Sequence, residues 1–171
     1  MNEQAICVLC EKFAEKAHIP DKVGYFIKCD ACGEYFLASP EIFESSYATL
    51  PREKRTMISC YTRDCFEHRR EPPQLEDAGY LTGIITEYEH KTIDDKLKNL
   101  IFYIRKKSAQ SGDRVFLEAR KDYPVTYSLG PEGFAEILNN AIEQRLIKST
   151  ETGFELTEQG WKLGTELFEK E

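Results

Sequence analysis

Two short cysteine pairs decide how the amino-terminal part of this chain folds: residues 7–10 read Cys7-Val8-Leu9-Cys10, and residues 29–33 read Cys29-Asp30-Ala31-Cys32-Gly33. Eighteen residues separate the pairs, a spacing typical of a site in which four thiolates bind one metal ion. Two thiolates three residues apart can face the same ion when the backbone turns sharply between them, and a second such turn completes a tetrahedron. Gly33 lets the chain leave the second turn with a positive φ at little steric cost. The spacing therefore predicts a zinc site with four ligands: Cys7, Cys10, Cys29 and Cys32.

This predicted ion has a structural role. Four protein ligands leave zinc no open coordination position, so the ion cannot activate water. We expect one structural Zn2+ ion and no catalytic residue. The alternative is that the cysteines are buried thiols or a redox pair, because an isolated CxxC can be redox-active. Two such pairs usually share a metal, which favours zinc.

The residues around the cysteines predict a zinc ribbon over residues 1–38. Apolar positions at residues 25–27 and 35–37 indicate two short strands on either side of a tight turn. A segment of about 38 residues is too small to fold by hydrophobic burial alone, and a bound metal supplies the missing stability.

Residues 39–90 are predicted to form a helical segment followed by a linker. Ser39 can cap a first helix, and Pro40 has the fixed φ that suits its first turn. After the first helix, residues 52–70 contain no Gly or Pro, which indicates a second helix. Residues 71–90 contain prolines and glycines that interrupt the helical pattern, so we expect the linker there.

Residues 91–171 are predicted to form a winged-helix-like domain, which makes the whole chain α+β. Strand-like pieces at residues 114–117 and 123–128 precede a helix that Pro131 opens. A polar loop with Gly153 then joins two strands in a hairpin, the wing, and Thr157 caps a last helix. The first helix is indicated by apolar residues at helical spacing: Ile93, Leu97, Leu100, Ile101 and Ile104.

Composition limits the class of protein. The chain has 171 residues, of which 41% are hydrophobic, so it can bury a core. Its formal net charge of -7 describes a mildly acidic surface and disfavours a general polyanion binder. The amino terminus lacks the basic and apolar regions of a secretory signal, and no apolar run is long enough to span a membrane, so we expect a cytoplasmic protein. In a reducing compartment, its six cysteines favour metal binding or buried thiols over disulfides.

The other two cysteines, Cys60 and Cys65, lie five residues apart in the second predicted helix. Their side chains would point about 140° apart around the helix axis, which is a poor arrangement for sharing an ion. We expect buried or half-buried thiols. The alternative is a catalytic Cys60, with His68 close behind in the sequence, but no orienting group can be named for it.

The charge of the third helix of the winged-helix-like domain argues against DNA. A helix that reads DNA needs basic or amide side chains. Here residues 131–145 contain three glutamates and a single arginine at the end. From Asp122 onward, ten acidic residues stand against four basic ones, a net charge of −6, which disfavours a phosphate backbone. The wing is therefore predicted to contact a protein.

Positive charge gathers instead in residues 52–70. Tyr61 in this segment could stack on a base. The alternative is a solvated helix face with ordinary ion pairs, which is what most charge runs are. A patch for a nucleic acid or a nucleotide would use Arg52, Arg55, Tyr61, Arg63, Arg69 and Arg70.

Five stretches of the chain carry a family resemblance: Cys7-x-x-Cys10, Tyr25-x-Ile27-x-Cys29-x-x-Cys32-Gly33-x-Tyr35-x-Leu37, Ile58-Ser59-x-Tyr61-x-Arg63, Asp122-Tyr123-Pro124 and Leu156-Thr157-x-x-Gly160-Trp161. This pattern resembles a bacterial zinc-ribbon and winged-helix-like module that precedes a Toll/interleukin-receptor-like (TIR-like) or nucleoside-deoxyribosyltransferase-like effector domain. The resemblance implies a sensing, docking or oligomerising role in nucleotide signalling or phage defence, with catalysis in the effector domain. It carries no catalytic residue over to this chain.

These observations favour a non-enzymatic zinc-binding adaptor or sensor whose winged-helix-like domain contacts a protein partner or a second copy of the chain. The alternative is a DNA-binding transcriptional regulator that uses the zinc ribbon or the basic helix of residues 52–70. No membrane contact is expected.

Overall fold

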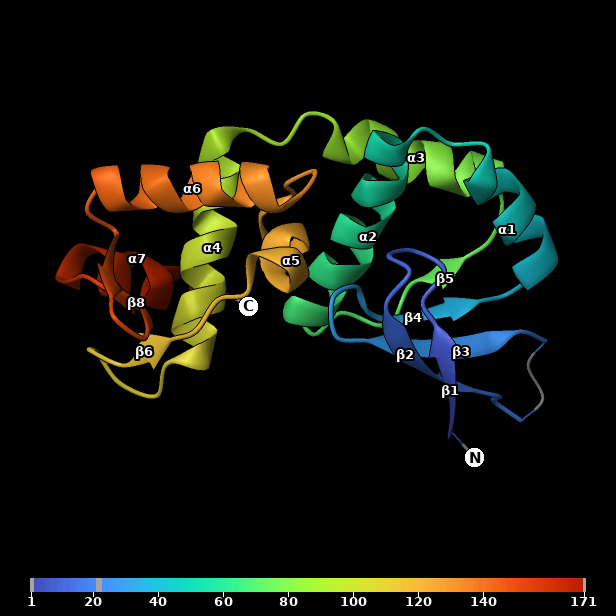
Figure 1. The fold of residues 1–171 in the computed structure, drawn as a ribbon, viewed down its shortest axis with the longest axis horizontal. Coiled ribbons are helices and arrows are strands. Elements are labelled where there is room, and N and C mark those ends of the chain that lie inside the picture. The colour runs from blue at the N-terminus through green and yellow to red at the C-terminus, as the bar shows by residue number, and fades with distance from the viewer. Residues whose placement is uncertain (1, 21–22, 171) are drawn as a thin grey trace. The chain divides into compact units, whose positions relative to one another are not determined.

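The computed structural model describes residues 2–20 and 23–170, and the chain divides into two compact units, Met1–His90 and Lys91–Glu171. The described residues form seven α-helices and two β-sheets, so the fold is of the mixed α+β class (Figure 1). Residues 1–38 and 39–90 both belong to the first unit. Within the described ranges, no helix has the length and apolar character needed to cross a membrane.

The first unit contains a five-stranded sheet and three helices. Its first four strands form an antiparallel meander in chain order, and the short fifth strand pairs in parallel with the fourth. The elements are β1 (Asn2–Ile6), β2 (Phe13–Ala17), β3 (Tyr25–Cys29), β4 (Gly33–Leu37), α1 (Pro40–Ala48), α2 (Arg52–Glu67), β5 (Gln74–Leu75) and α3 (Ala78–Tyr88).

One face of this sheet forms the core of the first unit. Ile27, Tyr35 and Leu37 alternate toward that face along β3 and β4, and all three are buried. Helix α2 packs on β4, and α3 packs on α2. The predicted strands at residues 25–27 and 35–37 are confirmed. Strands β1 and β2 were not expected, because each is a short run that mixes polar and apolar residues without a continuous apolar face.

Residues 71–90 differ from the linker that their prolines and glycines indicate. They form strand β5 and helix α3. The Asp77 carboxylate accepts hydrogen bonds from the backbone N–H groups of Gly79 (2.9 Å) and Tyr80 (3.1 Å) and thereby caps the helix. Four apolar or aromatic side chains on one face are buried and outweigh the low helix propensity of glycine; they are Leu81, Ile84, Ile85 and Tyr88.

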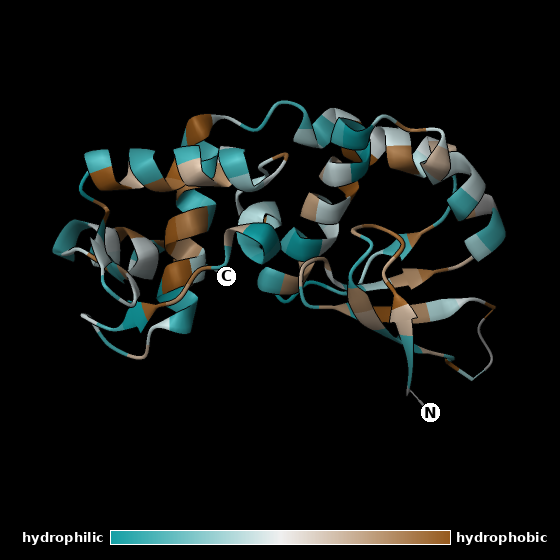
Figure 2. Cartoon of the chain, in the orientation of Figure 1, coloured by the Kyte–Doolittle hydropathy of each residue, from teal (hydrophilic) through white to brown (hydrophobic). Residues whose placement is uncertain are grey.

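The second unit packs its helices around α4, whose apolar residues recur along the ribbon in Figure 2. A three-stranded antiparallel sheet in the order β6-β8-β7 completes the unit. The elements are α4 (Ile93–Lys107), β6 (Arg114–Val115), α5 (Ala119–Asp122), the 3-10 helix η1 (Tyr123–Thr126), α6 (Pro131–Glu143), β7 (Ile147–Thr150), β8 (Gly153–Leu156) and α7 (Glu158–Phe168). The core residues are Leu97, Leu100, Ile101, Tyr103, Ile104, Val115, Leu117, Val125, Phe134, Ile137, Ala141, Leu146, Ile147 and Leu156.

Most of the elements predicted for the second unit are present, and one predicted strand is a 3-10 helix. The first helix, the helix that Pro131 opens, the hairpin and the last helix are present. Residues 123–128 contain a 3-10 helix instead of a strand, because Pro124 sits in its first turn and Tyr127 ends it in the left-handed conformation (φ 52°).

The last helix approaches the hairpin closely. The Thr157 hydroxyl accepts a hydrogen bond from the backbone N–H of Gly160 (3.1 Å), as expected of a cap. A Cβ atom at position 160 would lie 1.9 Å from the carbonyl oxygen of Leu146. Only glycine therefore lets α7 lie this close to the start of β7.

Candidate metal centre

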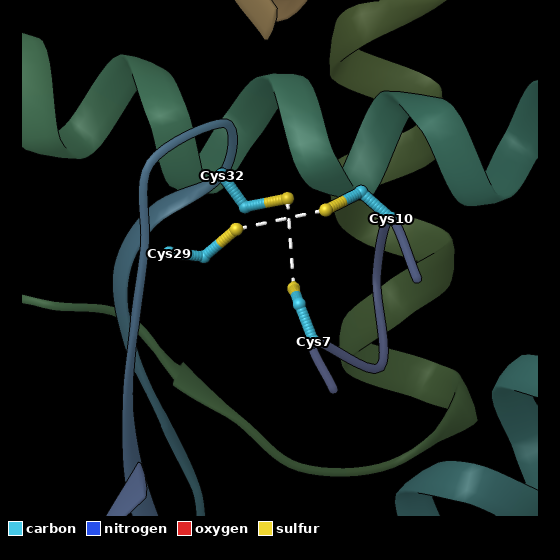
Figure 3. Close-up of side chains that lie close together, drawn as sticks. All are labelled: Cys7, Cys10, Cys29 and Cys32. Atoms are coloured by element: carbon cyan, nitrogen blue, oxygen red, sulfur yellow. Dashed lines mark hydrogen bonds between the residues drawn. The ribbon is translucent and has the colours of Figure 1, made fainter. Parts of the chain in front are cut away.

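The four cysteines of the two pairs lie on two tight turns of the first sheet. Cys7 and Cys10 belong to the turn between β1 and β2, whereas Cys29 ends β3 and Cys32 directly precedes β4. Their Sγ atoms point toward one another and all lie within 4.8 Å (Figure 3). The distance is 3.6 Å between the sulfurs of Cys10 and Cys29, and 3.8 Å between those of Cys7 and Cys32.

These distances fit a metal ion at the centre of the group. A Zn–S bond is about 2.3 Å long, and the corners of a regular tetrahedron with that radius are about 3.8 Å apart. A disulfide would bring two sulfurs to about 2.05 Å, and all six cysteines are free thiols. The cluster of four cysteines could therefore hold a metal ion, and a set of four thiolates is suited to soft or borderline metals such as zinc.

Two hydroxyl groups contact the buried sulfurs of the cluster. The hydroxyl of Tyr35 lies 3.1 Å from the sulfur of Cys7, and that of Ser59 lies 3.0 Å from the sulfur of Cys32. The pKa of Tyr35 is raised well above its ordinary value, mainly because the side chain is buried and secondly because it lies close to Cys7. Tyr35 therefore keeps its proton and can donate a hydrogen bond to a Cys7 thiolate, as groups around metal ligands commonly do.

Without a metal ion, four thiols this close affect one another strongly. The hydrogen bond with Cys10 lowers the pKa of Cys29 well below the ordinary value of a thiol. Contacts with Cys10 and the other cysteines, together with burial, raise the pKa of Cys32 well above it. Like charges packed this closely repel, so a cation is needed before all four can be thiolates at once.

Helix α2 supports the second cysteine turn through a buried ion pair. The guanidinium of Arg63 donates to the carbonyl oxygens of Asp30 and Ala31, the two residues between Cys29 and Cys32. Its Nε atom lies 2.7 Å from a carboxylate oxygen of Glu67, and both side chains are less than a tenth exposed. Arg63 therefore fixes the backbone of the turn, and Glu67 balances its charge inside the unit.

The first turn is held by helix α1. The hydroxyl of Tyr47 donates a hydrogen bond of 2.7 Å to the carbonyl oxygen of Leu9, which lies between Cys7 and Cys10. Tyr47 is buried and stacks on Phe43 with a centroid distance of 5.2 Å. In each cysteine turn, a main-chain carbonyl thus accepts a hydrogen bond from a side chain of a helix.

Sequence reasoning did not find these supporting residues. Tyr35 and Ser59 belong to the stretches that carry the family resemblance, but their roles follow only from the fold. The spacing of Ser59, Arg63 and Glu67 is the available signal, because residues four apart lie on one helical face. Polar residues on the buried face of a helix indicate that they form hydrogen bonds with other polar groups inside the unit.

The six residues of the predicted basic patch do not form one surface. Arg63 is buried against the second cysteine turn, and Tyr61 is half-buried with its hydroxyl 3.0 Å from that of Tyr80. Arg70 pairs with the buried carboxylate of Asp64, to which Tyr88 also donates. The exposed Arg52 begins α2, Arg55 lies one turn further on, and the exposed Arg69 follows its end. At about 1.5 Å per residue, the two ends of such a helix are about 24 Å apart.

The expectation of buried thiols at Cys60 and Cys65 is confirmed, because they are 1% and 4% exposed. Burial raises the pKa of the Cys65 thiol. Neither residue belongs to the four-cysteine group. His18 and His90 are both exposed.

Gly33 provides the first test of the turn geometry. It has φ 78°, and a Cβ atom there would lie 2.5 Å from the Cβ atom of Phe66 on α2. We expect Gly33→Ala to destabilise the first unit by about 3 kcal/mol through backbone strain and overpacking. Thermal unfolding followed by circular dichroism measures this change.

Gly83 is the matched control for that substitution. It lies inside α3, and no atom lies within 4 Å of a Cβ built there. Gly83→Ala is expected to stabilise the protein by roughly 0.5–1 kcal/mol, because alanine has the higher helix propensity. Equal effects of the two substitutions would contradict the role assigned to Gly33.

No protein-family profile, curated protein or solved structure matches this chain.

Proposed function

We propose that this protein is a non-enzymatic zinc-binding adaptor or sensor. Its amino-terminal sheet is a zinc ribbon with one structural Zn2+ ion, bound by Cys7, Cys10, Cys29 and Cys32. The observation that carries the proposal is the group of four sulfurs within 4.8 Å of one another on two turns. Four thiolates complete a tetrahedral zinc site, so the ion stabilises the fold and leaves no position for a substrate.

Metal analysis tests the zinc proposal directly. The purified full chain is expected to contain one equivalent of zinc by plasma mass spectrometry, and to lose it to a strong chelator together with its structure near the cysteines. A preparation that holds less than about half an equivalent while the first unit stays folded would refute the proposal, because a structural site must be filled to stabilise the fold.

In this proposal, residues 91–171 are a winged-helix-like domain for protein contact. The order α4, β6, α5, α6, the β7–β8 hairpin and α7 supports it. Three glutamates of α6 are exposed, namely Glu132, Glu136 and Glu143, and they disfavour a phosphate backbone. Two apolar side chains beside them, Leu129 and Ile142, are 47% and 37% exposed and favour a protein surface as the partner.

The biological setting is proposed from the family resemblance alone. The protein would act with an effector enzyme of bacterial nucleotide signalling or phage defence, in the cytoplasm. The partner is then either that effector or a second copy of this chain.

A DNA titration separates this proposal from the transcriptional-regulator alternative. Exposed arginines at the two ends of α2, Arg52 and Arg69, are what favour the alternative. We expect no binding to a short labelled duplex beyond the weak non-specific range, about 10⁻⁴–10⁻⁶ M at physiological salt. Anisotropy at about 50 and 200 mM salt is the measurement. Submicromolar binding whose affinity falls by about 10³-fold or more between these salts would support the regulator instead.

A further inference from the structure

The four cysteines of the zinc site differ in how well they are protected. Cys7, Cys29 and Cys32 are at most 3% exposed, whereas Cys10 is only half-buried. The sulfurs of Cys7 and Cys32 contact the hydroxyls of Tyr35 and Ser59. Among the described residues, no side-chain hydroxyl contacts the sulfur of Cys10. A hydrogen bond to a thiolate withdraws electron density, so the Cys10 sulfur keeps more of its nucleophilicity, and Cys10 is also the least buried of the four residues.

We infer that Cys10 is a site of oxidative modification by hydroperoxides, and that it closes a disulfide with Cys29 and releases the metal ion. This inference rests on the proposed zinc site, and it names hydroperoxides as the signal to which the proposed sensor responds. The sulfurs of Cys10 and Cys29 are 3.6 Å apart, and a disulfide requires about 2.05 Å. Once the oxidised Cys10 sulfur is no longer bound to the ion, rotation about side-chain bonds can supply this approach.

The chemistry takes two steps. The Cys10 thiolate attacks a peroxide oxygen; an S–O bond forms, the O–O bond breaks, and hydroxide or an alkoxide leaves. The Cys29 thiolate then attacks the sulfur of the Cys10 sulfenic acid; an S–S bond forms, the S–O bond breaks, and hydroxide leaves. The two thiolates together lose two electrons, and the peroxide gains them. With two of its four ligands gone, Zn2+ dissociates, and Cys7 and Cys32 take up protons from water.

The second pair of sulfurs is the competing route, and the surroundings disfavour it. The sulfurs of Cys7 and Cys32 are 3.8 Å apart, a similar distance, but both side chains are fully buried. Each of these two sulfurs also has a hydroxyl contact, with Tyr35 or Ser59, which lowers its nucleophilicity. Cys60 and Cys65 are also buried, and neither belongs to the four-cysteine group.

The experiment treats the zinc-loaded full chain with hydrogen peroxide. A metallochromic dye follows zinc release, and mass spectrometry of alkylated peptides maps the disulfides. We expect zinc release to rise together with a Cys10–Cys29 cross-linked peptide as the first disulfide. A Cys7–Cys32 disulfide appearing first, or disulfides spread evenly over all cysteines, would overturn the inference.

A ligand exchange at position 10 gives the second measurement. Cys10→His keeps a four-ligand zinc site, because zinc also accepts three thiolates and one imidazole, but removes the reactive sulfur. Peroxide-driven zinc release is expected to slow by at least about tenfold, because the thiolate that reacts first with peroxide is gone. Cys60→Ala is the matched control and should release zinc at the unchanged rate. Equal rates for Cys10→His and the unmodified protein would overturn the inference.

The two proposals fail in different ways. A protein that contains no zinc before peroxide is added would refute the proposed zinc site, and with it the oxidation route. A protein that contains one equivalent of zinc but is oxidised first elsewhere would refute only the role of Cys10.

Discussion

The Cys32→Ala protein is expected to lack bound metal and to unfold its first unit at a temperature at least about 15 °C lower. Structural zinc contributes about 10–16 kcal/mol in small zinc-finger peptides. The first unit also buries an apolar sheet face under its helices, so we expect the loss to be smaller, at least about 4 kcal/mol. In a domain of this size, each kcal/mol moves the melting temperature by about 4–8 °C. Metal analysis and calorimetry measure both quantities.

Hydrogen exchange locates this loss within the chain. Exchange in Cys32→Ala should speed up in residues 2–90 and stay unchanged in residues 91–170, because the two units have separate cores. Cys65→Ala removes another buried thiol of the same unit that is not in the four-cysteine group, and it is expected to cost only about 1 kcal/mol. If Cys32→Ala keeps its metal, or melts like Cys65→Ala, the four-thiolate site is wrong.

The cysteine cluster could be predicted because its geometry is local. Each CxxC pair sits on one tight turn, and the turn alone brings its two sulfurs together. The groups that surround the sulfurs come from distant parts of the chain: Ser59 is 27 residues from Cys32, and Tyr35 is 28 residues from Cys7. Their contacts depend on how α2 and β4 pack around the turns, and this packing cannot be predicted from the spacing of residues in the sequence.

Helix α3 and strand β1 show two further limits. The glycines of α3 lower its local helix propensity, but the buried face of the helix and the Asp77 cap decide its structure. Strand β1 lies at the edge of the sheet and has a mostly polar sequence. Its strand conformation comes from pairing with β2 and could not be predicted from its composition. Helix α4 has a strong apolar period and a capping box of Thr92 and Asp95, and its position could be predicted.

The Arg63→Met substitution is expected to destabilise the first unit by about 3–5 kcal/mol and to weaken zinc binding by about 10–100-fold. Both effects come from the buried position of Arg63. Its removal leaves the carboxylate of Glu67 buried beside an apolar side chain, and it takes a donor away from the carbonyls of Asp30 and Ala31. Thermal unfolding measures the first effect, and competition with a zinc chelator measures the second.

A companion substitution separates the two effects. Adding Glu67→Gln to Arg63→Met neutralises the carboxylate that has lost its arginine and should recover part of the lost stability, because a buried carboxylate that has lost its counter-ion costs more than a buried amide. Zinc affinity should stay low in the double variant, since the carbonyls of the cysteine turn still lack their donor. Arg52→Met changes an exposed arginine of the same helix and should alter neither quantity. Recovery of zinc affinity in the double variant would mean that Arg63 acts only by balancing Glu67 and does not position the turn that holds Cys29 and Cys32.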